Sequence, residues 1–201
     1  MIFRIFAAVI GTYILGSIPS AYLFVKWWRG QDVRRAGSGN VGTLNALRVT
    51  GSKGIALLVL CLDVLKGVLI FLVARGIGGD QGLVLGAGIL AGVLGHMFPV
   101  WLRFHGGRGL AVSAGILLFL TPKLVVLWLL LWGVGYLLFR TVIFASIGAL
   151  LVILLFIWWP AAGVCPTGDA ALLTLLTLML IAKHLPRFYD ALSGRKLKSM
   201  I

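Results

Sequence analysis

Acidic residues are almost absent from this chain, and their scarcity excludes several classes of protein. Only five of the 201 residues are acidic, and all five are Asp. Without Glu there is no H-E-x-x-H motif, and no carboxylate pair or carboxylate-rich cluster stands in the sequence, which argues against a metal hydrolase. The two cysteines, Cys61 and Cys165, form neither a zinc motif nor a disulfide framework. We therefore expect no metal and no cofactor.

Charged residues of either sign are also few, and long apolar runs take their place. Charged side chains make up 11% of the chain and hydrophobic ones 61%, with a mean hydropathy of +1.09. Soluble domains average about 25% charged and about 45–50% apolar residues, so a soluble or a disordered chain is excluded. The apolar runs predict a single all-α membrane domain, residues 1–201, built as a bundle of seven transmembrane helices. These runs cover 5–25, 54–74, 82–102, 109–120, 124–139, 141–159 and 170–182.

The charges that are present are mostly basic, and they predict the orientation of the helices. Eighteen Lys and Arg give the chain a formal net charge of +13. In a soluble protein this excess would indicate nucleic acid, but in a membrane protein basic residues concentrate in the cytoplasmic loops. With the N-terminus outside, only Arg4, Arg75 and Lys123 fall in outer segments, and Lys66 falls within a span. We therefore expect a cytoplasmic C-terminus and no nucleic-acid partner.

Two glycine-rich segments interrupt the apolar pattern on the predicted cytoplasmic side. The first, residues 26–53, contains Gly-Ser-Gly-Asn-Val-Gly at 37–42, followed by Arg48. It matches G-x-G-x-x-G, but a dinucleotide site needs a buried strand before the glycines, and arginines stand there instead. The second, residues 95–109, contains Gly-Gly-Arg-Gly at 106–109, directly before an apolar helix. No Walker A motif occurs in the chain.

Glycines next to basic residues predict sites for anions. Backbone N–H groups in such loops can converge on an oxyanion, and the free N–H groups at the start of a helix attract negative charge. Two such loops on one membrane face indicate two phosphate groups, or one phosphate held from both sides. The alternative is that each is an ordinary polar turn carrying the arginines expected on the cytoplasmic side.

Three histidines and one charged pair are the other candidates for chemistry. His96, His105 and His184 all map to the cytoplasmic side, where each is either a proton acceptor or a hydrogen-bonded structural residue. Asp63 and Lys66 lie three positions apart on one face of a predicted span. An ion pair that shapes the bundle and a role near a substrate both remain open for them.

Three stretches of the sequence together resemble the PlsY family, bacterial membrane glycerol-3-phosphate acyltransferases that use acyl phosphate as donor. The stretches are GSGNVGTLNALR, LDVLKG and GHMFPVWLRFHGGRG. The residues that match the family motifs are Ser38, Gly39, Asn40, Gly42, Asn45, Arg48, Asp63, Lys66, Gly67, Gly95, His96, Phe98, Pro99, Phe104, Gly106, Gly107 and Gly109. The similarity runs in order over nearly the whole chain, and it implies seven spans with the N-terminus outside.

The sequence departs from the family pattern at three places. Thr43 and Leu44 stand where the family has Ala-Thr, and Arg108 replaces the usual Lys. Near the C-terminus the chain keeps His184, but Arg187 stands where the family has Asn.

The resemblance implies transfer of a fatty acyl group from acyl phosphate to glycerol-3-phosphate, which gives lysophosphatidate for phospholipid biosynthesis. It also implies a multi-pass protein of the bacterial inner membrane, surrounded by lipid, with its active site facing the cytoplasm. The implied catalytic residues are His184, His96 and Asn45. The implied phosphate- and substrate-binding residues are Ser38, Gly39, Asn40, Gly42, Arg48, Gly106, Gly107, Arg108 and Gly109, with Asp63 and Lys66 in support. The alternative is a diverged, inactive relative that binds anionic lipid or transports a small anion.

Overall fold

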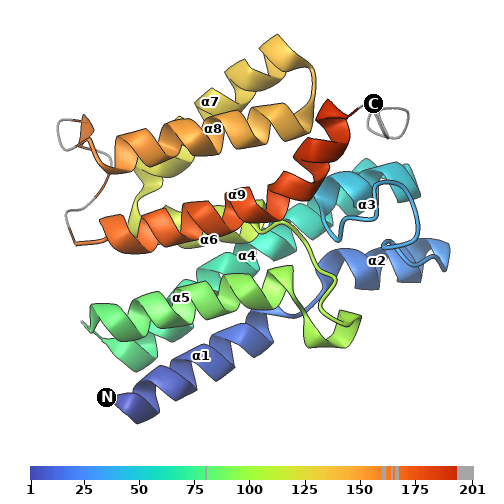
Figure 1. Cartoon of the computed structure of the whole chain (residues 1–201). Helices are drawn as coiled ribbons and strands as arrows, with labels where there is room; N and C mark the ends of the chain where they lie inside the picture. Colours follow the sequence, from blue (N-terminus) through green and yellow to red (C-terminus); the bar gives the residue numbers. More distant parts are fainter. Residues whose placement is uncertain (80, 160–161, 164, 166–167, 194–201) are drawn as a thin grey trace. The chain divides into compact units, whose positions relative to one another are not determined.

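The computed structural model describes residues 1–79, 81–159, 162–163, 165 and 168–193, and the regular structure of these residues is helical throughout (Figure 1). The basic residues Arg195, Lys196 and Lys198, expected on the cytoplasmic side, lie outside them. The α-helices are α1 (Ile2–Gly16), α2 (Ser20–Arg29), α3 (Thr43–Thr50), α4 (Lys53–Gly78), α5 (Gly82–Met97), α6 (Leu110–Leu120), α7 (Pro122–Phe139), α8 (Val142–Ile157) and α9 (Ala170–Leu192). A short 3-10 helix, η1, covers Val100–Leu102. The chain forms two compact units, Met1–Phe119 and Leu120–Ile201, each with its own internal packing.

Several of the helices are long and apolar enough to cross a membrane. Among the described residues, five segments meet this condition: Ile2–Arg29, Lys53–Gly78, Gly82–Leu102, Pro122–Phe139 and Ala170–Leu192. Two further apolar helices, Leu110–Leu120 and Val142–Ile157, are shorter. The 11 residues of α6 rise only about 16 Å, roughly half of a hydrocarbon core of about 30 Å. Each segment corresponds to one apolar run of the sequence, which confirms the all-helical prediction.

The first apolar run, expected as one helix over 5–25, is broken in the structure. α1 ends at Gly16 and α2 begins at Ser20, with Pro19 immediately before it. Proline has no backbone N–H, and its ring disfavours helical backbone in the residue before it. The carbonyl of Ile18 therefore lies outside both helices, where it accepts a hydrogen bond of 2.5 Å from Lys66 Nζ.

Lys66 also forms the ion pair that its spacing from Asp63 indicated. Its Nζ lies 3.0 Å from Asp63 Oδ1, and the two side chains are only 5% and 4% exposed. Charges buried this deeply depend on each other, because removing one partner leaves the other desolvated and uncompensated. The pair ties α4 to the break between α1 and α2, so the ion pair is confirmed. A supporting role of these two residues near a substrate stays a prediction.

Three other boundaries differ from the apolar runs. The α-helix expected over 82–102 ends at Met97, because Pro99 disfavours helical backbone at Phe98, and η1 follows. The helix expected over 170–182 continues to Leu192 and includes Pro186. Nothing in the hydropathy pattern predicts α3, which is a short helix, half polar and half apolar, within the first glycine-rich segment.

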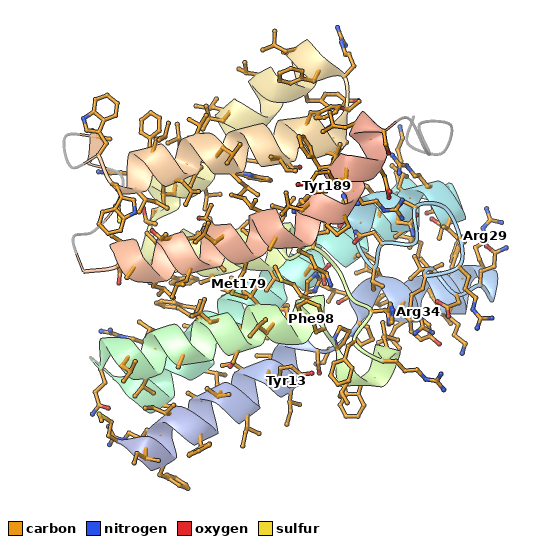
Figure 2. All side chains as sticks on the ribbon, in the orientation of Figure 1. Tyr13, Arg29, Arg34, Phe98, Met179 and Tyr189 are labelled. Atoms are coloured by element: carbon orange, nitrogen blue, oxygen red, sulfur yellow. The ribbon has the colours of Figure 1, made fainter. Side chains whose placement is uncertain are left out.

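Glycines allow α1 and α5 of the first unit to approach closely. A Cβ atom on Gly16 would collide with the carbonyl oxygen of Gly92, and one on Gly95 would collide with that of Tyr13. At the end of this contact the Tyr13 hydroxyl donates a hydrogen bond of 2.8 Å to the Phe98 carbonyl (Figure 2). Close backbone packing through small residues is typical of helices in membranes, where lipid is as apolar as the helix surface.

A small hydrophobic core holds the two glycine-rich segments in place. Its buried members are Ala21, Val25, Val33, Val41, Ala46, Ile55, Val59 and Leu102. Val33 and Val41 come from the first segment and Leu102 comes from the second. Ala46 comes from α3 within the first segment, and the others belong to α2 and α4, so both segments are anchored to these two helices by apolar contacts.

In the second unit, α8 packs against both α7 and α9. A short turn joins α7 to α8 at Arg140, which adopts the left-handed backbone conformation. Trp132 of α7 donates its indole N–H to the Ser146 hydroxyl of α8 at 3.2 Å. Phe144 of α8 meets Phe188 of α9 edge to face, with ring centroids 5.4 Å apart. Aromatic side chains therefore hold these three helices together.

Candidate active site

One buried side chain, Asn45, holds the first glycine-rich loop in shape. It lies in the first turn of α3 and is only 1% exposed. Its Oδ1 accepts a hydrogen bond of 2.7 Å from the Ser38 N–H, and its Nδ2 donates to the carbonyls of Val33 and Ala36 at 2.9 and 3.1 Å. Gly37 has φ +57°, and a Cβ there would overlap Asn45 Oδ1, so this turn requires glycine. These contacts make Asn45 a positioning residue, and its catalytic role stays a prediction.

Three backbone N–H groups of this loop donate to groups of the protein itself, whereas we expected the N–H groups to converge on an anion. The N–H groups of Gly39 and Gly42 donate to carbonyls three and two residues earlier, at 3.1 and 3.2 Å. Asn45 takes the N–H of Ser38. Anion binding at this loop stays a prediction, and side chains are the groups left to provide it. Those that match the family pattern are Ser38, Asn40 and Arg48.

The second glycine-rich loop folds back against the end of α5. The N–H of Gly106 donates to the Met97 carbonyl at 3.2 Å, and the N–H of Gly107 donates to the His96 carbonyl at 3.1 Å. Both N–H groups are committed to the fold, and the absence of side chains lets this loop lie flat on the helix end. Binding of a phosphate by these two glycines stays a prediction.

Gly107 is the point at which the two loops and a histidine meet. A Cβ on Gly107 would overlap His96 Nε2 and would lie 2.6 Å from the Val41 carbonyl oxygen. His96 is 8% exposed, so its ring is buried next to this glycine. Residues 41 and 107 are distant in sequence and adjacent in space, so the two glycine-rich segments meet at this point.

Arg108 and Gly109 lead from this meeting point into α6. Gly109 has φ +88°, a left-handed conformation that directs the chain into the helix beginning at Leu110. The first turn of an α-helix has backbone N–H groups without intrahelical partners and carries the positive end of the helix dipole. A phosphoryl group at this position would meet both the dipole and the charge of Arg108.

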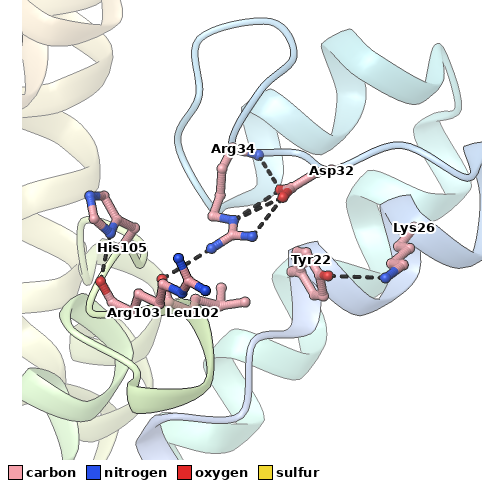
Figure 3. A network of polar contacts seen from close by, with 7 residues as sticks. All are labelled: Tyr22, Lys26, Asp32, Arg34, Leu102, Arg103 and His105. Atoms are coloured by element: carbon pink, nitrogen blue, oxygen red, sulfur yellow. Dashed lines mark hydrogen bonds and ion pairs between the residues drawn. The ribbon is translucent and has the colours of Figure 1, made fainter.

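Arg34, which the sequence did not single out, forms an ion pair within the first segment and a hydrogen bond to the second. Arg34 donates to both carboxylate oxygens of Asp32, at 2.6 Å for the shortest contact, and to the Leu102 carbonyl at 3.1 Å (Figure 3). Its guanidinium group also lies over the Tyr22 ring, 5.3 Å from the centroid. The hydrogen bond from Arg34 lowers the pKa of Asp32 below its ordinary value of 3.8, and the same hydrogen bond raises the pKa of Arg34. Asp32 is one of only five acidic residues in the chain, and its place two residues before Arg34 was the signal in the sequence for this pair.

His184 belongs to the second unit, where it is fully buried in α9. Its Nδ1 lies 2.7 Å from the Leu180 carbonyl oxygen one helical turn earlier. A carbonyl accepts only, so this contact assigns the proton to Nδ1 and leaves Nε2 as the basic nitrogen. This tautomer suits a proton acceptor, and the catalytic role of His184 stays a prediction. Among the described residues, no group of three or more His, Cys, Asp or Glu could hold a metal ion.

Comparison with known proteins identifies the family of this chain. A family model for glycerol-3-phosphate acyltransferase matches residues 6–194. The chain belongs to this family. Relatives named glycerol-3-phosphate acyltransferase include proteins of Synechococcus elongatus, 44% identical over 115 residues, and Rhodopseudomonas palustris, 46% identical over 101 residues. These alignments cover 53% and 50% of this chain and 54% and 50% of the relatives, so the chain spans about half the length of the curated relatives it matches.

Two solved structures are similar to nearly the whole chain. One is the crystal structure of PlsY, an integral membrane glycerol 3-phosphate acyltransferase, in the glycerol 3-phosphate form, with a TM-score of 0.83 and 35% identity. It covers 96% of this chain and 94% of that one. The lysophosphatidic acid form of PlsY gives a TM-score of 0.81, 34% identity and coverage of 96% and 93%. The resemblance read from three sequence motifs is thereby confirmed.

Proposed function

We propose that this protein transfers a fatty acyl group from acyl phosphate to glycerol-3-phosphate, giving lysophosphatidate and inorganic phosphate for phospholipid synthesis. The observation that carries the proposal is the arrangement at Gly107, where two glycine-rich loops meet beside His96 and the start of α6. Family membership and the similarity to PlsY in its glycerol 3-phosphate form support the same acceptor.

The donor's chemistry determines what the protein has to supply. An acyl phosphate is a mixed anhydride, so no covalent enzyme intermediate is required. A hydroxyl oxygen of glycerol-3-phosphate attacks the acyl carbon, the carbon–oxygen bond to the phosphate breaks, and the phosphate leaves with that electron pair. The hydroxyl proton passes to a base or to the departing phosphate. The protein must hold two phosphoryl groups, orient the hydroxyl and stabilise the developing oxyanion.

Two phosphoryl groups call for two sets of basic and polar groups. We assign one phosphoryl group to the side chains of Ser38, Asn40 and Arg48, with Asn45 positioning the loop that carries the first two. We assign the other to Arg108 and the first turn of α6. We assign the role of proton acceptor to either His184 or His96. The residue that acts must lie within hydrogen-bond reach of the hydroxyl. The glycines that shape this site are Gly39, Gly42, Gly106, Gly107 and Gly109.

The membrane arrangement is part of the same proposal. The chain would form one domain of seven crossings in the bacterial inner membrane, with the N-terminus outside and the C-terminus in the cytoplasm. The active site would then face the cytoplasm, where glycerol-3-phosphate is soluble, with the acyl chain of the donor among the helices. The candidate spans and the scarcity of basic residues in the outer segments support this arrangement.

The activity is tested with purified protein in lipid, supplied with palmitoyl phosphate and glycerol-3-phosphate. We expect lysophosphatidate from the parent protein and from Arg108→Lys, since Lys is the family's usual residue. We expect the rate of lysophosphatidate formation by Arg108→Ala to fall at least about a hundredfold, which is the typical effect of removing a group that stabilises developing charge. Product no greater than that of Arg108→Ala would contradict the acyltransferase proposal. Binding of glycerol-3-phosphate without turnover would instead favour an inactive, anion-binding relative.

A further inference from the structure

We infer that the first unit carries a second phosphate-binding pocket, outside the proposed active site, formed by Arg34, Arg35, Trp101, Arg103 and His105. Their side chains line a surface pocket of about 500 Å³. None of the residues that match the family's phosphate-binding motifs is among these five. The inference does not rest on acyl transfer, because an inactive protein would have the same pocket.

The positive charge of this pocket is only partly compensated. Asp32 pairs with Arg34, at 2.6 Å. The guanidinium groups of Arg35 and Arg103 are exposed, and they have no ion-pair or hydrogen-bond partner among the described residues. Asp32 also attracts Arg35, but without a direct ion pair, and its carboxylate is already bonded to Arg34. Two arginines that face one pocket without a direct carboxylate partner are suited to an anion, and the planar guanidinium matches the oxygens of a phosphate group.

The pocket is built before any ligand arrives. Arg34 is fixed by Asp32 on one side and by the Leu102 carbonyl on the other (Figure 3). On the opposite wall, Arg103 and Phe104 adopt φ of +52° and +62°, and His105 Nδ1 lies 2.6 Å from the Arg103 carbonyl oxygen. Left-handed backbone at two adjacent non-glycine residues is costly, and such residues cluster at ligand sites. The turn therefore fixes the backbone from which the Arg103 side chain extends into the pocket.

The aromatic residue of the pocket indicates where the phosphate comes from. Trp101 is 64% exposed, while its indole N–H donates to the buried Ser17 hydroxyl at 2.8 Å, which fixes the ring at the end of α1. Exposed tryptophans with a polar anchor are enriched at the membrane–water interface, and basic clusters there attract anionic lipids. The ligand class is a phosphate group, carried either by an anionic phospholipid at that interface or by a soluble phosphate.

The lipid source is tested by native mass spectrometry of the protein released from bilayers of phosphatidylcholine and phosphatidylglycerol. We expect the parent protein to retain phosphatidylglycerol selectively. Arg35→Ala with Arg103→Ala should reduce this retention at least about tenfold, because each arginine contributes a charge-assisted hydrogen bond. The matched control is Arg4→Ala with Lys53→Ala, which removes the same net charge from two exposed residues outside the pocket.

The soluble source is tested by equilibrium dialysis of radiolabelled inorganic phosphate against the same proteins in neutral detergent. A deficit in the arginine double variant, relative to the control variant, assigns the pocket to a soluble phosphate; a deficit in lipid retention alone assigns it to phospholipid. Should the double alanine variant not purify as a folded protein, Arg35→Lys with Arg103→Lys replaces it, with weaker binding expected because lysine cannot bind a phosphate through two parallel hydrogen bonds. Equal binding by pocket and control variants in both measurements would overturn the inference.

Discussion

Asn45 is the residue on which the shape of the first glycine-rich loop depends most directly. Asn45→Ala removes its three hydrogen bonds and leaves one N–H and two carbonyl groups of the loop without their partner. We expect the free energy of unfolding to fall by about 2–4 kcal/mol, the sum expected for such bonds. The measurement is the melting temperature of the purified protein in detergent.

Asn40 provides the matched control for this substitution. It is the same residue type in the same loop, but it is partly exposed and makes none of those bonds. Asn40→Ala should leave the melting temperature nearly unchanged and lower the rate of acyl transfer. Equal melting temperatures of the two variants would show that Asn45 does not hold the loop.

The ion pair of Asp32 and Arg34 gives the protein a pH dependence whose sign follows from the lowered pKa of Asp32. The folded carboxyl group binds a proton less readily than the unfolded one, so the pair stabilises the fold above the ordinary pKa of 3.8. That contribution is lost as the pH falls through the lowered pKa of the folded state. We expect Asp32→Asn to be less stable by up to about 1 kcal/mol near pH 7, and this difference should shrink as the pH falls below 3.8 and the folded carboxyl group takes up its proton. Melting curves of both proteins across this range provide the test, and a constant difference would contradict the assignment.

At the scale of the helices, the contact between α1 and α5 depends on the absence of a side chain at Gly16. Gly16→Ala places a methyl group against the Gly92 carbonyl, so the helices must move apart. We expect a loss of about 1–3 kcal/mol, as for other overpacked interiors. Gly11→Ala is the control in the same helix, because the nearest atom to its added Cβ is Val73 Cγ1 at 4.0 Å. That variant should be unchanged or stabilised by up to about 1 kcal/mol, and thermal unfolding of both distinguishes a packing effect from a general effect of alanine in α1.

The observed ends of the helices show which structural features the apolar pattern predicts and which it does not. Apolar runs predicted where the long helices lie, because hydrophobic side chains are needed along a whole span. They did not predict that Pro19 would divide the first run, nor that the freed Ile18 carbonyl would become a partner for Lys66. The short helix α3 also escaped prediction, since eight residues, only half of them apolar, are too few to show a clear apolar period. The helix buries Asn45, Ala46 and Thr50. Their burial can be recognised only in the folded protein, where α3 contacts the small hydrophobic core.

At the scale of the whole molecule, the proposed topology predicts which positions share a compartment. Lys53 and Lys123 are both exposed, and the charge distribution assigns them to opposite sides of the membrane. In a variant with Cys61 and Cys165 replaced by Ala, a single cysteine is placed at position 53 or 123. A membrane-impermeant maleimide applied to intact spheroplasts should label position 123 only, and position 53 should react after the membrane is opened. Labelling of position 53 in intact spheroplasts would contradict an N-terminus on the outer side.

The sequence by itself determined the helical class, the places of the long helices and the two glycine-rich loops. Such features follow from short stretches of sequence, because a helix in hydrocarbon must form its backbone hydrogen bonds internally and present apolar side chains along its length. Motif similarity determined the family in the same way, through residues close together in the chain.

Only the tertiary structure decided which contacts those two loops make with each other. Gly107 lies against His96 and the Val41 carbonyl, and Arg34 reaches the Leu102 carbonyl. Several loop amides that the sequence suggested for anion binding, those of Ser38, Gly39, Gly42, Gly106 and Gly107, donate to groups of the protein itself. Contacts of this kind join residues that are far apart in the chain, and they depend on the space left between packed helices, which neither periodicity nor local spacing records.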